Sequence, residues 1–218
     1  MLPRVLEPEV MDTPEEAAAY DALDHAEVNR VFVTDLLASG PLEGLILDLG
    51  TGTAQLPIEL CRRCDRCYVL AVDLSVQMLE LARYNIEVAS LIQQIQLGHV
   101  DAKQLPYGND QFATVISNGT LHHIPDPTAM LAEAARVAAP GGLLFFRDLL
   151  RPDSDDAVHR LVQGYTGQAT EQQQQLFAAS LRAAFRLDEL QALVAQLGFD
   201  PEMVRATSDR HWTWQARK

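Results

Sequence analysis

From residue 45 to residue 147, short apolar runs alternate with longer segments in which apolar residues recur every three or four positions. The short runs predict buried β-strands, because a strand covered on both faces is apolar throughout. The longer segments predict helices that bury one face. We expect strands at 45–49, 68–72, 95–97, 112–117 and 142–147, and helices at 53–62, 76–89 and 127–138. This alternation predicts an α/β fold built from right-handed β–α–β units around a parallel sheet.

The segments that flank this core follow other patterns. Residues 14–38 have helical spacing, with Thr13 as a cap and Pro14 at the first position, and they form one helix or two. Residues 151–186 are polar and helix-prone, and Gly164 and Gly167 predict a break in them. A helix at 187–197 and a hairpin of strands at 202–207 and 211–217 complete the chain. We expect one domain over 1–218, divided into an N-terminal helical cap (1–40), a core (41–150), a helical insertion (151–186) and a C-terminal helix and hairpin (187–218).

The composition of the chain limits the types of binding partner and the cellular locations that we expect for the protein. The 218 residues carry a net charge of −13, and an acidic protein repels phosphate backbones, so nucleic acid is a disfavoured partner. Residues 1–40 hold nine acids and two arginines and therefore carry a net charge of −7. We see neither a signal peptide nor an apolar run long enough for a membrane helix, and three cysteines, an odd number, argue against a disulfide framework. These features predict a cytoplasmic protein without membrane attachment. We expect a monomer or a homodimer, although none of these features bears on the oligomeric state.

A glycine-containing turn after the first predicted strand is the strongest chemical signal. Gly50, Thr51 and Gly52 follow that strand, and glycine lets the backbone approach a ligand closely. Asp73 ends the next apolar run, where a carboxylate can accept hydrogen bonds from two ribose hydroxyls. The pairing predicts an adenosine-type cofactor. Gln55 stands where a dinucleotide fingerprint has its third glycine, which disfavours nicotinamide and flavin.

Five segments in order resemble the motifs of the class I S-adenosylmethionine-dependent methyltransferases. They are LDLGTGT at 47–53, AVDLS at 71–75, HVDAKQLPY at 99–107, ISNGTLHHIPDP at 116–127 and APGGLLFFRD at 139–148. The resemblance implies S-adenosylmethionine as cofactor and a Rossmann-like, doubly wound sheet of about seven strands. That sheet is mostly parallel with an antiparallel last strand, and helices cover both faces. It also implies methyl transfer, and the absence of an Asn-Pro-Pro-Tyr-type signature at 118–121 favours a small-molecule acceptor.

The resemblance also assigns cofactor-binding residues, some of which have a plainer alternative. Asp48 is expected at the amino-acid end of the cofactor, or else as a capping or solvated acid. Leu74 and Met78 line the adenine pocket, although Met78 also suits a core. Asp101 accepts from the adenine amino group, or else only forms a turn, while Ala102 offers a backbone N–H. The full predicted set is Asp48, Gly50, Thr51, Gly52, Asp73, Leu74, Met78, Asp101, Ala102 and Asn118.

Methyl transfer from a sulfonium depends mainly on alignment, so a general base is needed only for a nucleophile that must lose a proton. The candidates for such a base are His122, His123, Asp148 and Tyr165. Adjacent histidines on a helix point about 100° apart, so we do not expect them to share a metal ion. Cys61, Cys64 and Cys67 lack a fourth ligand, so we expect no metal there either.

The acceptor pocket is expected from residues 1–40 and 151–186, which lie outside the common sheet, with Tyr20 as a possible lid over the cofactor. Two other functions stay open at this point. One is a nicotinamide-dependent oxidoreductase, which Gln55 disfavours. The other is a catalytically silent module that binds the cofactor and regulates another enzyme. A measurement of catalytic turnover, by methyl transfer or by an absorbance change with NAD, distinguishes these two functions from a methyltransferase.

Overall fold

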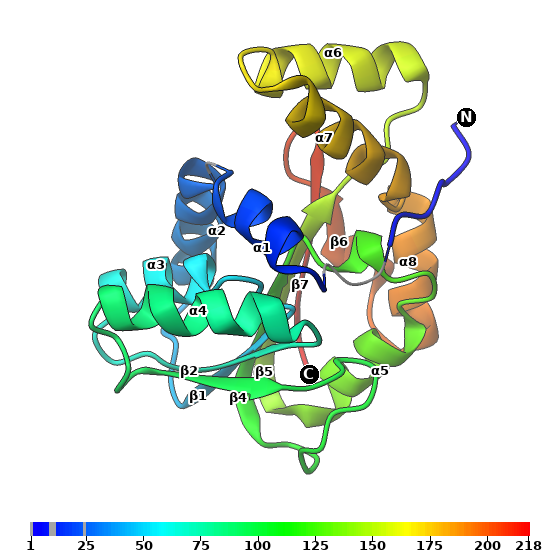
Figure 1. Ribbon diagram of the computed structural model, residues 1–218. Helices are drawn as coiled ribbons and strands as arrows, with labels where there is room; N and C mark the ends of the chain where they lie inside the picture. Colours follow the sequence, from blue (N-terminus) through cyan, green and yellow to red (C-terminus); the bar gives the residue numbers. More distant parts are fainter. Residues whose placement is uncertain (1, 9–11, 24) are drawn as a thin grey trace. The chain divides into compact units, whose positions relative to one another are not determined.

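The fold is built on a seven-stranded mixed sheet in the order β3-β2-β1-β4-β5-β7-β6 (Figure 1). The computed structural model describes residues 2–8, 12–23 and 25–218. The strands are β1 Leu45–Leu49, β2 Tyr68–Asp73, β3 Ile95–His99, β4 Phe112–Asn118, β5 Ala138–Leu149, β6 Val204–Ala206 and β7 His211–Arg217. Strand β7 pairs antiparallel with β6. The predicted Rossmann-like sheet with an antiparallel last strand is confirmed.

Helices connect the strands, and helices also precede β1. They are α1 Pro14–Asp21, α2 Ala26–Ala38, α3 Gln55–Arg63, α4 Val76–Val88, α5 Thr128–Val137, α6 Asp155–Thr166, α7 Glu171–Ala183 and α8 Leu187–Gln196. Short 3₁₀ turns cover Leu121–His123 (η1) and Pro201–Met203 (η2). The Thr13 side chain accepts from the Glu16 N–H in a capping box, so the predicted start of the first helix is confirmed.

The chain divides into two compact units, which we describe separately. Unit 1 consists of residues 1–9, 119–127 and 147–214, and unit 2 of residues 10–118, 128–146 and 215–218. Strands β5 and β7 each contribute residues to both units. The assignment of the whole chain to one domain stays a prediction.

Unit 2 contains the parallel part of the sheet. Strand β1 pairs in parallel with β2 and with β4, and β2 pairs in parallel with β3. The carboxyl ends of these four strands therefore lie at one edge of the sheet. Apolar residues of the strands pack with α2, α3 and α4 in a single core, in which Phe32 meets Phe145 edge-to-face at 5.0 Å between ring centroids. This core fixes the strand ends on which the predicted cofactor residues stand.

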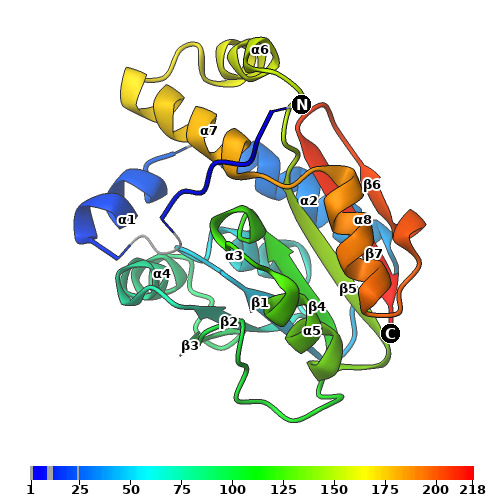
Figure 2. The ribbon, with the colours of Figure 1, turned by 90° about the vertical axis from the view of Figure 1, so that its right-hand side faces the viewer.

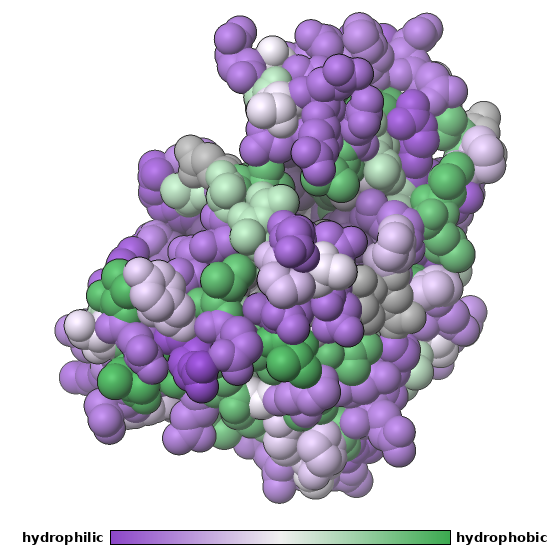
Figure 3. All heavy atoms as spheres, viewed as in Figure 1, coloured by the Kyte–Doolittle hydropathy of each residue, from purple (hydrophilic) through white to green (hydrophobic). Residues whose placement is uncertain are grey.

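Unit 1 contains the helical insertion and the C-terminal elements. Helices α6 and α7 pack together over a small cluster of Val158, Val162 and Leu181, and α8 lies alongside β6 and β7 (Figure 2). Hydrophilic side chains dominate the outward surface of α6 and α7 (Figure 3). The polar character of 151–186 is therefore that of two amphipathic helices, separated at residues 167–170.

Several element boundaries and one covalent bond differ from the expectation; the expected strand at 202–207, for example, is reduced to β6 at Val204–Ala206. Helix α3 begins at Gln55, because Ala54 takes a left-handed φ of 62° that a helix cannot include. Gly164 lies inside α6, so only the break near Gly167 is confirmed. Strand β5 begins at Ala138, before the predicted start at 142.

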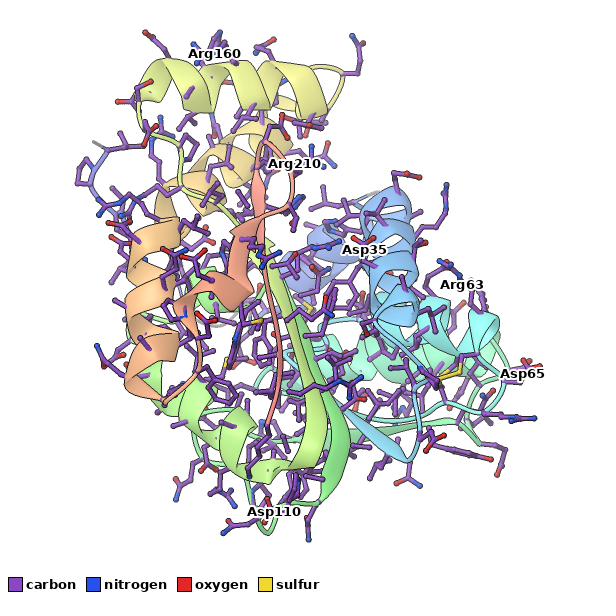
Figure 4. All side chains as sticks on the ribbon, turned by 180° about the vertical axis from the view of Figure 1, so that it is seen from behind. Asp35, Arg63, Asp65, Asp110, Arg160 and Arg210 are labelled. Atoms are coloured by element: carbon purple, nitrogen blue, oxygen red, sulfur yellow. A yellow bond between two sulfur atoms is a disulfide. The ribbon has the colours of Figure 1, made fainter. Side chains whose placement is uncertain are left out.

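The odd number of cysteines argued against a disulfide framework, and the structure contains one local bridge, between Cys64 and Cys67. Cys64 ends helix α3 and Cys67 precedes β2, and the tight turn between them brings their Cα atoms to 5.5 Å, within the range for a bridge. The bond is the yellow link beside Asp65 in Figure 4. Cys61 stays a free, buried thiol.

Candidate functional site

The glycine turn and Asp73 are joined directly in unit 2. Gly50 and Gly52 have φ values of 72° and 56°, a region that glycine adopts without steric cost. Asp73 Oδ2 accepts a hydrogen bond from the Gly52 N–H at 2.7 Å, and its Oδ1 accepts one from the Ser75 N–H at 2.9 Å. Burial raises the pKa of Asp73, and these backbone donors oppose that shift. Each carboxylate oxygen keeps a further lone pair, so the group can still accept from a ligand.

Buried polar atoms without partners gather where β1 meets this turn. Asp48 is 1 % exposed, and burial raises the pKa of its carboxyl to about 7. Among the described residues, Asp48 Oδ2, Thr51 Oγ1 and Thr53 Oγ1 are buried and have no hydrogen-bond partner. Such groups are costly unless a ligand or water satisfies them. They fit the amino-acid end of S-adenosylmethionine, which offers ammonium donors and a positive charge.

Two further predicted cofactor residues stand around the end of β2. Leu74, 37 % exposed, follows β2, and its carbonyl oxygen lies 2.9 Å from His99 Nε2. Met78 is buried in the first turn of α4, where its N–H donates to the capping Ser75 Oγ. The burial of Met78 is compatible with both of its predicted roles.

The remaining predicted cofactor residues follow the next strands. Asp101 comes after β3, and its Oδ1 accepts from the Lys103 N–H at 2.8 Å, as a turn-forming aspartate does. Ala102 follows it in the same turn, and Asn118 is the last residue of β4. Because the strands are parallel, the structure brings the ten predicted cofactor residues to one edge of the unit 2 sheet.

Tyr20, the predicted lid, also lies near this turn in unit 2. A Cβ atom placed on Gly52 would be 3.5 Å from Cε1 of the Tyr20 ring. Asp21 next to it accepts from Asn85 Nδ2 at 3.0 Å, which ties α1 to α4. The position suits the predicted role, which stays a prediction.

Three of the four candidate bases meet in unit 1. Asp148 is 1 % exposed. The backbone N–H of His122 donates a hydrogen bond to Asp148 Oδ2 at 3.0 Å, and the ring Nδ1 of His122 lies 2.6 Å from Asp148 Oδ1. Burial by itself lowers the pKa of His122, but Asp148 and Glu7 outweigh it and raise the pKa to about 9. Burial likewise raises the pKa of Asp148, and the His122 charge reverses the shift to a net lowering. The pair is a buried, charge-assisted contact.

Glu7 and His123 complete this cluster. Glu7 Oε1 lies 3.3 Å from His122 Nε2 and 3.2 Å from His123 Nδ1. Burial and the neighbouring His122 lower the pKa of His123 to about 4. The two imidazole rings lie in the η1 turn with their centroids 4.1 Å apart, so the divergence expected for adjacent helical histidines does not separate them.

Tyr165, the fourth candidate, makes its contacts elsewhere. Its hydroxyl donates to Asp209 at 2.8 Å, and the Arg210 guanidinium stacks on its ring at 3.3 Å from the centroid. Tyr165 lines a cavity of about 1080 Å³ in unit 1, together with residues of 150–154, α6 and the first turns of α8. That cavity draws on the segment predicted to bind the acceptor.

Residues 47–146 match the family model described as "Methyltransferase domain". This segment is a class I S-adenosylmethionine-dependent methyltransferase domain. S-adenosylmethionine is the methyl donor of that class, so the predicted family and cofactor are confirmed.

Curated relatives of the methyltransferase domain come from several bacteria. Methyltransferase GfsG of Streptomyces halstedii is 29% identical over 156 residues, which cover 71% of this chain and 52% of the relative. The demethylmenaquinone methyltransferase of Deinococcus radiodurans is 34% identical over 134 residues, 61% of this chain and 54% of the relative. The chain thus spans about half the length of these relatives. A solved SAM-dependent methyltransferase from Aquifex aeolicus shares the fold, with a TM-score of 0.67, 17% identity and coverage of 94% and 98% of the two chains.

The N-terminal segment contributes two residues to the cluster around His122 that the sequence did not indicate. Arg4 donates to the backbone carbonyls of His122, Ile124, Pro125 and Ala183 at 2.6–3.1 Å, and it stacks on Phe185. Glu7 follows on the same segment. Residues 2–8 contain no helical or strand periodicity, and only the isolated arginine in an acidic region distinguished them.

Proposed function

We propose that the chain transfers a methyl group from S-adenosylmethionine to a small-molecule acceptor. The observation that carries the proposal is the Asp73 carboxylate, which is bonded to the Gly52 N–H and stands at the carboxyl end of β2. This is the position from which an acid in an open α/β sheet binds the ribose hydroxyls of an adenosine cofactor. The unpartnered Asp48 Oδ2 adds a site for the ammonium group.

The acceptor belongs to the class of small molecules on three grounds. Related proteins are named for demethylmenaquinone, malonyl-[acyl-carrier protein] and phosphatidylethanolamine, so this family serves diverse acceptors. Residues 118–121 read Asn-Gly-Thr-Leu, unlike the signature for amino groups of bases or glutamine. The net charge of −13 disfavours nucleic acid. We propose that residues within 1–40 and 151–186 select the acceptor.

The chemical step requires alignment more than acid–base catalysis. A sulfonium is already a good leaving group, and positioning alone can supply about 7–11 kcal/mol of the barrier. His122, His123, Asp148 and Tyr165 stay candidates for a general base where the acceptor carries a proton. A cytoplasmic location, and a monomer or homodimer, also stay proposals; among the described helices, none is long and apolar enough to cross a membrane.

Release of S-adenosylhomocysteine from the purified full chain tests the proposal. The panel contains carboxylates, phenols, amines and quinols, including the acceptors for which the relatives are named. We expect acceptor-dependent release that Asp73→Ala reduces and Asp65→Ala, a change on an exposed turn, leaves unchanged. Tight cofactor binding without release from any acceptor would favour the silent regulatory module. An absorbance change with NAD and no methyl transfer would instead favour the oxidoreductase.

A further inference from the structure

Glu7, His122 and His123 present one potential metal ligand each at a common point in unit 1. One ligand atom from each residue lies within 4.8 Å of the other two. The side chains are 13 %, 7 % and 16 % exposed. Glu7 Oε1 and His123 Nδ1 are both buried and lie 3.2 Å apart. A carboxylate oxygen and an imidazole nitrogen without a hydrogen repel each other unless a proton or a cation lies between them.

The distances agree with those around a tetrahedral metal ion. An ion with bonds of about 2.1 Å to nitrogen and oxygen holds its ligand atoms about 3.4 Å apart. Glu7 Oε1 is 3.3 Å from His122 Nε2 and 3.2 Å from His123 Nδ1, so two of the three edges already have this length. On the third edge, the ligand atoms of the two histidines lie within 4.8 Å of each other.

The second coordination layer is also in place. A histidine that binds a metal commonly donates its other ring N–H to a carboxylate, which fixes the tautomer and the ring orientation. His122 does this with Nδ1, which lies 2.6 Å from the buried Asp148 Oδ1, and its Nε2 therefore faces Glu7. The His123 ring hydrogen-bonds the backbone carbonyl of Pro8. Both imidazoles are thus oriented by groups outside the ligand set.

We propose that Glu7, His122 and His123 form a binding site for a divalent transition-metal ion, with Zn²⁺ as the best match. Two imidazoles and one carboxylate are a common ligand set for zinc and leave one tetrahedral position for water. The ionised carboxylates of Glu7 and Asp148 place two negative charges around the cation. Because Glu7 lies on the N-terminal segment, the ion links residues 2–8 to the η1 turn.

Metal binding by the untagged, chelator-treated full chain tests this site. Isothermal titration with Zn²⁺ should show one ion per chain. Co²⁺ should give the visible absorption bands of a tetrahedral nitrogen and oxygen site, without the near-ultraviolet charge-transfer band of a thiolate. That band distinguishes this site from binding at Cys61, Cys64 or Cys67.

Variants assign the site to its ligands. Glu7→Gln and His123→Gln each remove one ligand at nearly constant volume, and each should weaken Zn²⁺ binding by about tenfold or more, at least as much as loss of an outer-layer partner. His159→Gln, on the exposed face of α6, is the matched control and should bind as the unaltered chain does. Circular dichroism checks folding, and either folded ligand variant suffices for the decision. Absence of Zn²⁺ binding, or equal binding by the His123→Gln and His159→Gln variants, would overturn the proposal and leave a proton-sharing cluster.

Discussion

Replacement of Asp73 by alanine tests how the methyltransferase domain holds its cofactor. The Asp73 side chain has one role that the structure shows and a second role that we propose. It accepts from the backbone N–H groups of Gly52 and Ser75, and it is proposed to accept from the ribose hydroxyls. The first task concerns the stability of the turn, and the second concerns affinity. The two effects can be measured separately.

The expected magnitude follows from the hydrogen bonds lost. A hydrogen bond to a charged group contributes about 1.5–3 kcal/mol. Since about 1.4 kcal/mol changes Kd tenfold, we expect the Kd of Asp73→Ala for S-adenosylhomocysteine to rise roughly ten- to a hundred-fold. At a ligand concentration about 100 times the original Kd, the ligand stabilises the unaltered protein by about 2.7 kcal/mol, and a hundredfold weaker variant by about 0.4 kcal/mol.

Isothermal titration gives the Kd, and thermal unfolding with and without ligand gives the stabilisation. Asp65→Ala is the matched control, because Asp65 is an acid of unit 2 on an exposed turn (Figure 4). If Asp73→Ala stays folded and binds with unchanged Kd, the carboxylate only shapes the glycine turn, and the proposed ribose contact is refuted. A lower melting temperature with unchanged ligand stabilisation would lead to the same conclusion.

Two further predictions concern stability. Burial raises the pKa of Asp48 to about 7, so the folded protein holds this proton more tightly than the unfolded chain; the free energy of unfolding should fall as pH rises from about 4 to about 7. Denaturant titrations across that range should show a shallower decline for Asp48→Asn, and parallel curves would argue against a buried, protonated Asp48. Arg4→Ala should lower the free energy of unfolding by on the order of 2 kcal/mol, because four backbone carbonyls lose a charged donor. Arg160→Ala, which loses no hydrogen bond or ion pair to any described residue, is the control, and equal stability of the two variants would contradict the reasoning.

The sheet, and the gathering of the predicted cofactor residues at one of its edges, were predictable because both depend on local sequence. Apolar runs specify buried strands, and the glycine turn after β1 and the acid after β2 each follow from residues next to a strand end. The parallel pairing of β1 and β2 then brings Gly52 and Asp73 together without any further information. Details that depend on single residues, such as the left-handed Ala54, escaped the pattern.

The cluster around His122 was predictable only in part. His122, His123 and Asp148 were candidates because they follow strands at recognisable motifs. Glu7 was not, because an extended segment without periodicity gives no indication of where it docks. The disulfide escaped for a related reason, since an odd number of cysteines suggests none, while the geometry of one tight turn decides that Cys64 and Cys67 pair.

The contacts of Arg4 have a consequence for the order of events during synthesis. Its partners lie 118 to 179 residues further along the chain. At about 5–20 residues per second, they are made between about 6 and 36 s after Arg4 itself. The strands of unit 2 up to β4 are complete before any of those partners exists. The N-terminal segment therefore has no partner for Arg4 while the strands β1 to β4 are synthesised. It can dock only after the later residues that bind it have been made.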